Sequence, residues 1–488
     1  MRMQRSASFA ALVAGEAMVE EPRVARKIAG SAGPVDLRSL VDSLGAATGV
    51  TFEIWRRQAD SWAMVLRVLE ALITCSCSKQ APAPRWMLQE IESDLSPWRG
   101  QQIARSDMDA MERQWGHVFC RFRVQGGQLS TCDPSTIEVL GKLGGRGSEP
   151  WGQFEAMSRA ARLLLALGLL SEDSDFFVSV NIYDHAQMPV PVLTKARAVF
   201  APGLLRVPSY ELVGPLLDRI RIDLGPVMDW ETKAPLLYWR GGMRSFNSCP
   251  CPSDMSVWPP AWSRFNMSRF LTTEEHSPGP GNCDDLCRGV CQMVDSSISE
   301  AERSGQRLQH CRCHRHITNR TTFEFANRVR LCELSRKHPA LVDAKLSYVP
   351  PSYDGFVSDT CKDRDYTVEY SPFSDHAHFR YLMSTDGSTI DDTRVYWMLS
   401  TGSLVFKQIT PLLPFGVPGL EPWRHFVPVR EDLADLVAKV RWARRHDAEC
   451  RAMAERARDF AARYFTEDQI LHYILRAIQQ YQSLLASP

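Results

Sequence analysis

The sequence predicts a two-domain α/β protein, and three observations support this fold class. The chain has 488 residues, more than one ordinary hydrophobic core accommodates. Apolar helical segments alternate with short β-rich runs along most of its length. Polar residues follow directly after several of these runs, as at Tyr183-Asp184-His185. Ligands of α/β proteins bind at such carboxyl ends of strands, so the pattern also predicts where to look for a site.

The first α/β series begins after a variable extension, residues 1–85. We expect a helix over residues 106–114 capped by Ser106, and a strand over 117–123 that turns at Gly126-Gly127. A strongly apolar helix is expected over 154–169, followed by a strand over 176–182. Asp184 stands just beyond the end of that strand.

The second series begins with a strand over residues 236–239, which ends in Arg240-Gly241-Gly242. The remaining expected elements are a helix over 327–335, a strand near 341–344, a helix near 395–399, a strand over 403–406, an amphipathic helix on Leu433, Leu436, Val437 and Val440, and a last helix over 470–485 with a capping box from Thr466 to Gln469. Both series therefore follow the same helix-and-strand order.

Charge and hydropathy exclude some classes of partner. The 57 Lys and Arg residues balance the 57 Asp and Glu residues, so the overall charge gives no reason to expect nucleic acid. The longest apolar run, residues 163–170, is far shorter than the ~20 residues of a membrane-spanning helix. The apolar run at residues 9–13 is too short to predict a secretory signal.

Seven of the 14 cysteines lie between Cys249 and Cys313, in a segment rich in Pro, Ser and Gly. Three interpretations stay open: disulfides, a zinc site completed by His314 or His316, or reduced thiols in a loop. Asn266 and Asn319 each begin an N-glycosylation sequon. We expect no metal ion in the reaction itself, because no Asp-x-Asp motif stands in a suitable context.

Five stretches in a fixed order resemble the motifs of glycosyltransferase family 90, the Rumi-like protein O-glucosyltransferases and fungal capsule xylosyltransferases. They are Tyr238-Trp239-Arg240-Gly241, the Leu-Ser-Arg-Lys-His-Pro-Ala-Leu-Val-Asp-Ala run at 334–344, the donor loop from Arg380 to Arg394, Gly-Ser-Leu-Val-Phe at 402–406, and Pro-Trp-Arg-His-Phe-Val-Pro-Val at 422–429. Each motif is weak alone, but five in order are specific. The resemblance covers roughly residues 86–485.

The resemblance implies a GT-B architecture, in which two Rossmann-like domains face each other across a cleft. The expected boundaries are an acceptor domain at 86–235, a nucleotide-sugar domain at 236–430 with a Cys-rich insert at 248–318, and C-terminal helices at 431–488. It further implies an inverting, metal-free transfer of glucose or xylose from a UDP-sugar, without a cofactor, to a Ser of a protein or to a glycan. The family works in the lumen of the secretory pathway, the endoplasmic reticulum or Golgi.

The leaving diphosphate needs positive charge and hydrogen-bond donors. We therefore expect the donor site to contain Arg240, Gly241, Arg244, Asp386, Gly387, Ser388, Thr389, Arg394 and Phe406, with weaker candidates in Arg328 and His425. The loop from Gly387 to Arg394 is one residue longer than in the animal enzymes, and Asp391 and Asp392 add acidic side chains. This departure supports an alternative, a non-catalytic nucleotide-sugar-binding protein.

Asp184 matches the position of the family's catalytic aspartate, and a carboxylate there can take the proton of an attacking hydroxyl. His185 is a competing base but is expected to be only a neighbour. A further alternative is a polysaccharide transferase of the xylosyl or mannosyl type.

Overall fold

The computed structural model describes residues 84–116, 119–132, 149–166, 169–171, 173–179, 189–198, 204–209, 212, 216–243, 326–349, 355–386, 392–410 and 412–486. Contacts divide the chain into two units, one of Met1–Ala81 and Arg162–Leu169, the other of Pro82–Ala161 and Leu170–Pro488. Apart from the end of α9 (Glu149–Ala166), every element below lies in the second unit.

The first sheet has the strand order β2-β1-β3-β4-β6. Its strands are β1 (Phe119–Gln125), β2 (Gln128–Ser130), β3 (Asp175–Ser179), β4 (Val192–Thr194) and β6 (Leu204–Arg206). β1 runs antiparallel to β2 and β3, whereas β3, β4 and β6 are parallel. The sheet is thus mixed, and only its β3-β4-β6 side has the parallel pairing of a Rossmann-like domain.

The second sheet has the order β12-β10-β9-β7-β8, and all its pairs are parallel. Its strands are β7 (Ala234–Gly242), β8 (Val342–Tyr348), β9 (Phe379–Ser384), β10 (Leu404–Gln408) and β12 (Val427–Val429). Numbered along the chain, this is the doubly wound order 2-1-3-4-5, in which the winding direction changes between the first and third strands. Here that switch point lies between β7 and β9.

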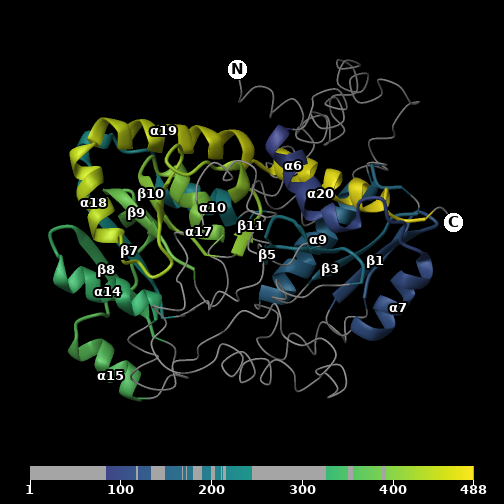
Figure 1. Ribbon diagram of the computed structural model, residues 1–488, viewed down its shortest axis with the longest axis horizontal. Coiled ribbons are helices and arrows are strands. Elements are labelled where there is room, and N and C mark those ends of the chain that lie inside the picture. Colours follow the sequence, from purple (N-terminus) through teal and green to yellow (C-terminus); the bar gives the residue numbers. More distant parts are fainter. Residues whose placement is uncertain are drawn as a thin grey trace, which may run out of the picture. The chain divides into compact units, whose positions relative to one another are not determined.

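Helices surround both sheets and supply most of the remaining core. They are α6 (Arg85–Asp94), η2 (Ser96–Trp98), α7 (Arg105–Trp115), α10 (Leu216–Leu224), η4 (Trp230–Thr232), α14 (Asn327–Lys337), α15 (Gly355–Asp363), α16 (Phe373–His376), α17 (Asp392–Ser400), η8 (Val417–Gly419), α18 (Leu436–Arg445), α19 (Asp447–Tyr464) and α20 (Glu467–Gln482). α19 packs against both α17 and β10, whereas α18 packs against β7 and β12 (Figure 1). One core cluster joins β7 to β10 with residues of α14, α18 and α19.

The helices and strands predicted from the sequence overlap elements of the structure, whereas β4, β6, β9 and β12 were not predicted and two predicted caps differ. α7 begins at Arg105, so Ser106 is inside the helix, and the Asp107 carboxylate accepts the Ala104 N–H at 2.9 Å instead. Thr466 precedes α20 as predicted, but no side-chain capping hydrogen bond forms. The hairpin prediction is confirmed, because Gly126 and Gly127 have φ of 56° and 72°, which favours glycine.

Several contacts join segments far apart in the sequence. A small third sheet pairs β5 (Ala196–Ala198) with β11 (Leu412–Pro414). The Gln482 side-chain amide bonds both backbone groups of Asp175 at the start of β3, at 2.9 and 3.3 Å. The Ile103 backbone exchanges hydrogen bonds with Leu484 and Ala486. The last helix and the residues after it are therefore tied to the start of β3 and to the segment before α7.

One disulfide, Cys120–Cys132, links β1 to the residues that follow β2. Cys332, Cys361 and Cys450 are buried free thiols. The Cys-rich insert lies outside the described residues, so the three interpretations of its cysteines stay open. The Cys120–Cys132 pair was not predicted, because both cysteines lie outside the cysteine-rich segment.

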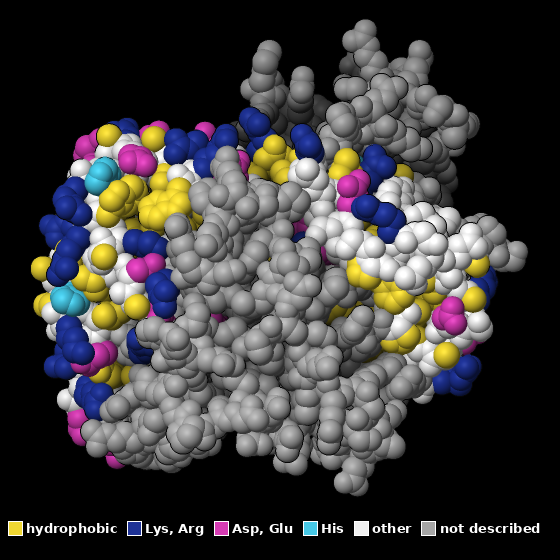
Figure 2. Space-filling view, in the orientation of Figure 1, with side chains coloured by type: hydrophobic (Ala, Val, Ile, Leu, Met, Phe, Trp, Pro, Cys, Tyr) yellow, Lys and Arg dark blue, Asp and Glu magenta, His cyan; other side chains and the backbone are white. Residues whose placement is uncertain are grey.

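The described surface carries both signs of charge. Figure 2 shows Lys and Arg side chains interspersed with Asp and Glu along the side that carries α14 and α18. This mixture agrees with the zero formal charge of the chain. Among the described helices, none combines the length and apolar character needed to cross a membrane.

Candidate functional site

The switch point of the second sheet brings the ends of β7 and β9 together with the first turns of α14 and α17. In doubly wound sheets, ligands bind at the carboxyl ends of the strands on either side of this point. Four of the residues expected from the sequence lie here: Arg240, Gly241, Asp386 and Arg394. The weaker candidate Arg328, on the first turn of α14, joins them.

Arg328 bridges the two strand ends. Its Nη1 donates to the Gly242 carbonyl of β7 at 2.7 Å, and its Nη2 approaches the Thr385 carbonyl just after β9 at 3.4 Å. The side chain is buried, with only 6% of its surface exposed. A buried guanidinium on backbone carbonyls keeps its full positive charge, so Arg328 makes this edge of the sheet cationic.

Arg394 reaches the same place from α17. Its Nη1 donates to the Arg240 carbonyl at 2.5 Å. The guanidinium carbons of Arg328 and Arg394 lie 5.6 and 5.9 Å from the centroid of the Trp239 ring, within cation–π range. Trp239 is fully buried, so its indole is the fixed surface that holds both arginines at the switch point.

The positive field of this edge affects a neighbouring histidine. Burial, together with the charges of Arg394 and Arg240, lowers the pKa of His376 to about 4. The imidazole lies between Tyr238 and Trp397, with ring centroids 4.9 and 5.0 Å away. His376 is therefore neutral at physiological pH and adds no charge of its own.

Gly241 is a position where a side chain does not fit. A Cβ built there would lie 2.6 Å from Cζ2 of Trp239 and 3.2 Å from Nη2 of Arg394. Its neighbour Gly242 differs, because the nearest atom to its Cβ would be 3.5 Å away, an ordinary contact. The absence of a side chain at Gly241 thus allows the indole and the Arg394 guanidinium to meet.

We predict that Gly241→Ala lowers the free energy of unfolding by about 1–3 kcal/mol, because the added methyl group must displace Trp239 or the backbone of β7. Gly242→Ala is the matched control in the same strand. Thermal unfolding followed by circular dichroism gives both values. Equal melting temperatures for the two variants would contradict the predicted crowding at Gly241.

The guanidinium of Arg240, one of the residues expected at the donor site, pairs with a carboxylate of the neighbouring strand β8. Its Nη1 lies 2.8 Å from Oδ1 of Asp343 and its Nη2 donates to Oδ2 at 3.0 Å, which neutralises the guanidinium. The same group lies 4.2 Å from the Tyr238 ring centroid. Side chains alternate along a strand, so Arg240 faces the opposite side of the sheet from Trp239. Arg240 contributes its carbonyl, which Arg394 binds.

Asp386 joins the ends of three strands. Its carboxylate accepts a 2.5 Å hydrogen bond from the Thr410 hydroxyl after β10, and its N–H donates to Oε1 of Gln408 at 3.1 Å. The Gln408 amide then donates to the Glu431 carbonyl after β12 at 2.6 Å. This chain of bonds fixes the relative positions of the ends of β9, β10 and β12.

Two further candidates are engaged in packing. Phe406 is fully buried in β10, and its ring centroid is 5.7 Å from that of Tyr381 in the core. His425 is also buried, and its Nδ1 accepts the Glu421 N–H at 2.8 Å. Burial lowers the pKa of His425 to about 4, with contributions from Arg424 and Arg456. A neutral His425 stabilises the turn that leads into β12.

The remaining candidates lie outside the described residues. They are Asp184, Arg244, Gly387, Ser388 and Thr389. The sequons at Asn266 and Asn319 and the extension at residues 1–83 lie there too. Their assignments stay predictions.

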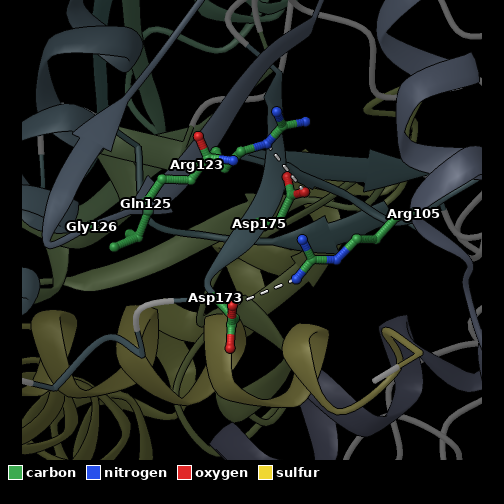
Figure 3. A pocket seen from close by; sticks show the side chains of 7 residues that line it. Arg105, Arg123, Gln125, Gly126, Asp173 and Asp175 are labelled. Carbon is green, nitrogen blue, oxygen red and sulfur yellow. Dashed lines mark ion pairs between the residues drawn. The ribbon is translucent and has the colours of Figure 1, made fainter. Parts of the chain in front are cut away.

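A shallow hollow of about 260 Å³ occurs far from this edge, beside the β1–β2 hairpin. Figure 3 shows Arg105 directed toward Asp173 and Arg123 directed toward Asp175. The nearby Arg121 makes two bonds to Asp175, at 2.8 and 2.6 Å. Because the charged groups that line the hollow pair with one another, it is a weaker candidate site than the switch point.

Two residues of the switch point were missed from the sequence, Trp239 and Thr385. Trp239 was quoted only as part of a motif, although its alternation with Tyr238 and Arg240 identifies it as an inward-facing residue. Thr385 is a polar residue directly after the buried strand β9, the same signal that drew attention to Asp184.

Fold and site together define a protein of the doubly wound α/β class with a cationic switch point. In comparison with known proteins, residues 319–487 match the model of Glycosyl transferase family 90. The matched segment includes β8, β9, β10 and β12 and both switch-point arginines on helices.

Individual relatives agree with the family match. The chain is 30% identical to protein O-glucosyltransferase 2 of Danio rerio over 157 residues, 32% of this chain and 30% of the relative. It is 28% identical to human protein O-glucosyltransferase 3 over 155 residues, 32% and 29% of the two chains. With human protein O-glucosyltransferase 1 it shares 30% identity over 153 residues, 31% and 38%. The matches thus span about a third of the length of these relatives.

Proposed function

We propose that the protein is an inverting glycosyltransferase that transfers glucose or xylose from a UDP-sugar to a hydroxyl group. The observation that carries the proposal is the pair Arg328 and Arg394, held on Trp239 at the switch point of a doubly wound sheet. When a nucleoside diphosphate leaves a sugar, negative charge grows on its phosphates. Guanidinium groups in a buried setting stabilise that charge and match phosphate geometry.

The proposed diphosphate site uses Arg328 and Arg394 because both guanidinium groups lie beside Trp239 at the strand ends, whereas the Arg240 guanidinium pairs with Asp343 of β8. Gly387, Ser388, Thr389 and Arg244 complete the proposed donor site. No cofactor or metal ion is needed in this proposal, since arginines and backbone N–H groups supply the positive charge that a metal ion supplies in other transferases.

The proposed architecture is GT-B, with the second sheet as the nucleotide-sugar domain and the first sheet as the acceptor domain. Asp184 is the proposed base: it follows β3, a fully buried strand, and takes the proton of the attacking hydroxyl. The names of the relatives support a protein acceptor, a Ser residue in this proposal, over a glycan.

The proposed compartment is the lumen of the secretory pathway. Its support is the Cys120–Cys132 disulfide, because disulfides persist in oxidising compartments and are rare in the cytosol. Protein O-glucosylation by the relatives also suggests a protein acceptor that passes through the same compartment.

The experiment is an assay of UDP release by the purified chain with UDP-glucose or UDP-xylose, with and without a folded Cys-rich acceptor module. We expect UDP release with at least one donor. Binding of UDP without any release would favour the second candidate, a non-catalytic nucleotide-sugar-binding protein, which the longer loop between Gly387 and Arg394 supports. Absence of UDP binding would contradict both.

A further inference from the structure

Two neutral hydrogen-bond donors are buried at the switch point, the indole N–H of Trp239 and the hydroxyl of Thr385. Neither Nε1 of Trp239 nor Oγ1 of Thr385 has a hydrogen-bond partner within the part of the chain that the structure describes. Both residues are fully buried as well. Unsatisfied buried donors are exceptional in folded proteins, because each costs about 1–3 kcal/mol, and they often mark the place of a bound group.

Trp239 lies beside both arginines, and Thr385 lies beside Arg328. The Cε2 and Cζ2 atoms of Trp239, which form the Nε1 edge of the indole, face Gly241, where Nη2 of Arg394 also lies. The Arg328 guanidinium lies over the Trp239 ring, and its Nη2 donates to the Thr385 carbonyl at 3.4 Å. Trp239, Gly241 and Thr385 fall on the same face of the sheet by strand alternation.

We propose that Trp239 and Thr385 are binding residues for the diphosphate, each donating one hydrogen bond to a phosphate oxygen held between Arg328 and Arg394. This inference rests on the proposed function and adds two neutral donors to its cationic site. The ligand class is a diphosphate anion, since two guanidinium groups and two neutral donors suit a group with several oxygen acceptors.

Two substitutions remove one donor each and keep the shape of the residue. Trp239→Phe keeps an aromatic ring under the arginines but has no N–H, and Thr385→Val replaces a hydroxyl by a methyl group. We expect each variant to bind UDP and inorganic pyrophosphate at least about ten-fold more weakly, as the loss of a hydrogen bond to a charged group predicts. Isothermal titration calorimetry measures both affinities.

Trp86→Phe is the matched control. Nε1 of Trp86 is also buried without a partner, but Trp86 packs in α6 against Phe415 and Phe460, away from the switch point. We expect its affinities to equal those of the wild type. A purely structural role for Trp239 or Thr385 would appear as a lower melting temperature, whereas removal of an unsatisfied donor does not destabilise the unliganded protein.

The outcomes separate this inference from the proposed function. If Trp239→Phe and Thr385→Val bind UDP and pyrophosphate as tightly as Trp86→Phe does, the inference is wrong and the donor site stands without them. If the wild type binds pyrophosphate through these residues but does not bind UDP, the anion site stands and the proposed nucleotide-sugar function fails. Binding of neither probe overturns both.

Discussion

Arg206→Met is expected to lower the free energy of unfolding by about 3–5 kcal/mol, because it leaves buried carboxylates without their counter-charge. Arg206 is 1% exposed, and its Nε and Nη2 each donate to Asp94 at 2.8 Å. Glu90 lies 3.5 Å from Nε and also accepts the Gly416 N–H. The side chains of Glu90 and Asp94 are fully buried, so water cannot replace the arginine.

The expected loss of stability is large because the Arg206, Asp94 and Glu90 network connects several elements. Arg206 ends β6, its carbonyl accepts the Tyr473 hydroxyl of α20 at 3.0 Å, and Glu90 holds the turn before η8. Denaturant titration of the wild type and the variant measures the change. Since folded domains are stable by only about 5–15 kcal/mol, the variant is expected to lie close to unfolding at 37 °C.

Arg336→Met is the control for this substitution. Arg336 also makes a two-bond pair with a carboxylate, at 3.0 and 2.7 Å from Glu333, but its side chain is 57% exposed. Water solvates the remaining Glu333, so we expect little change in the unfolding midpoint. Equal midpoints for Arg206→Met and Arg336→Met would show that burial of the Arg206 network has no energetic consequence.

Asp184→Asn is expected to reduce the rate of sugar transfer by about 10²–10⁴-fold, the range for loss of a general base. The amide keeps the size of the side chain but cannot accept the hydroxyl proton. Affinity for UDP should stay unchanged, because the proposed diphosphate site belongs to the other sheet. UDP release under saturating donor and acceptor measures the rate, and calorimetry with UDP measures the affinity.

His185→Gln tests the competing base. We expect it to retain most of the transfer rate, because His185 is predicted to be a neighbour of the reaction and not its base. A larger loss for His185→Gln than for Asp184→Asn would move the role of base to the histidine. If the wild type and Asp184→Asn release UDP equally slowly, the proposal of an enzyme fails.

The sequence predicted the second sheet better than the first. Its strands are buried runs with helices between them, and periodicity alone locates such runs, as at α17 and β10. The antiparallel pairing of β1 with β3 was not foreseen, since pairing depends on contacts between residues about 55 positions apart. The hydrophobic pattern within a single strand does not show which distant strand it pairs with.

The positions of the candidate residues could be predicted only in part. Arg394 and Arg328 were named from the sequence as candidates, and the structure brings them together beside Trp239. The ion pair of Arg240 with Asp343 was not predicted, because the two residues meet only when β7 pairs with β8. Trp239 was not named as a candidate, since a buried tryptophan in an apolar strand is typical of an ordinary core.

During synthesis, the contacts made by Gln482 can form only after nearly the whole chain has been made. The backbone of Asp175, at the start of β3, bonds a side-chain amide that is made 307 positions later. The backbone of Ile103 bonds residues 484 and 486. At ~5–20 residues per second, a ribosome needs roughly 15–60 s to make that interval. Throughout this time Asp175 and Ile103 lack these partners, so the nascent chain is expected to depend on chaperones until α20 emerges.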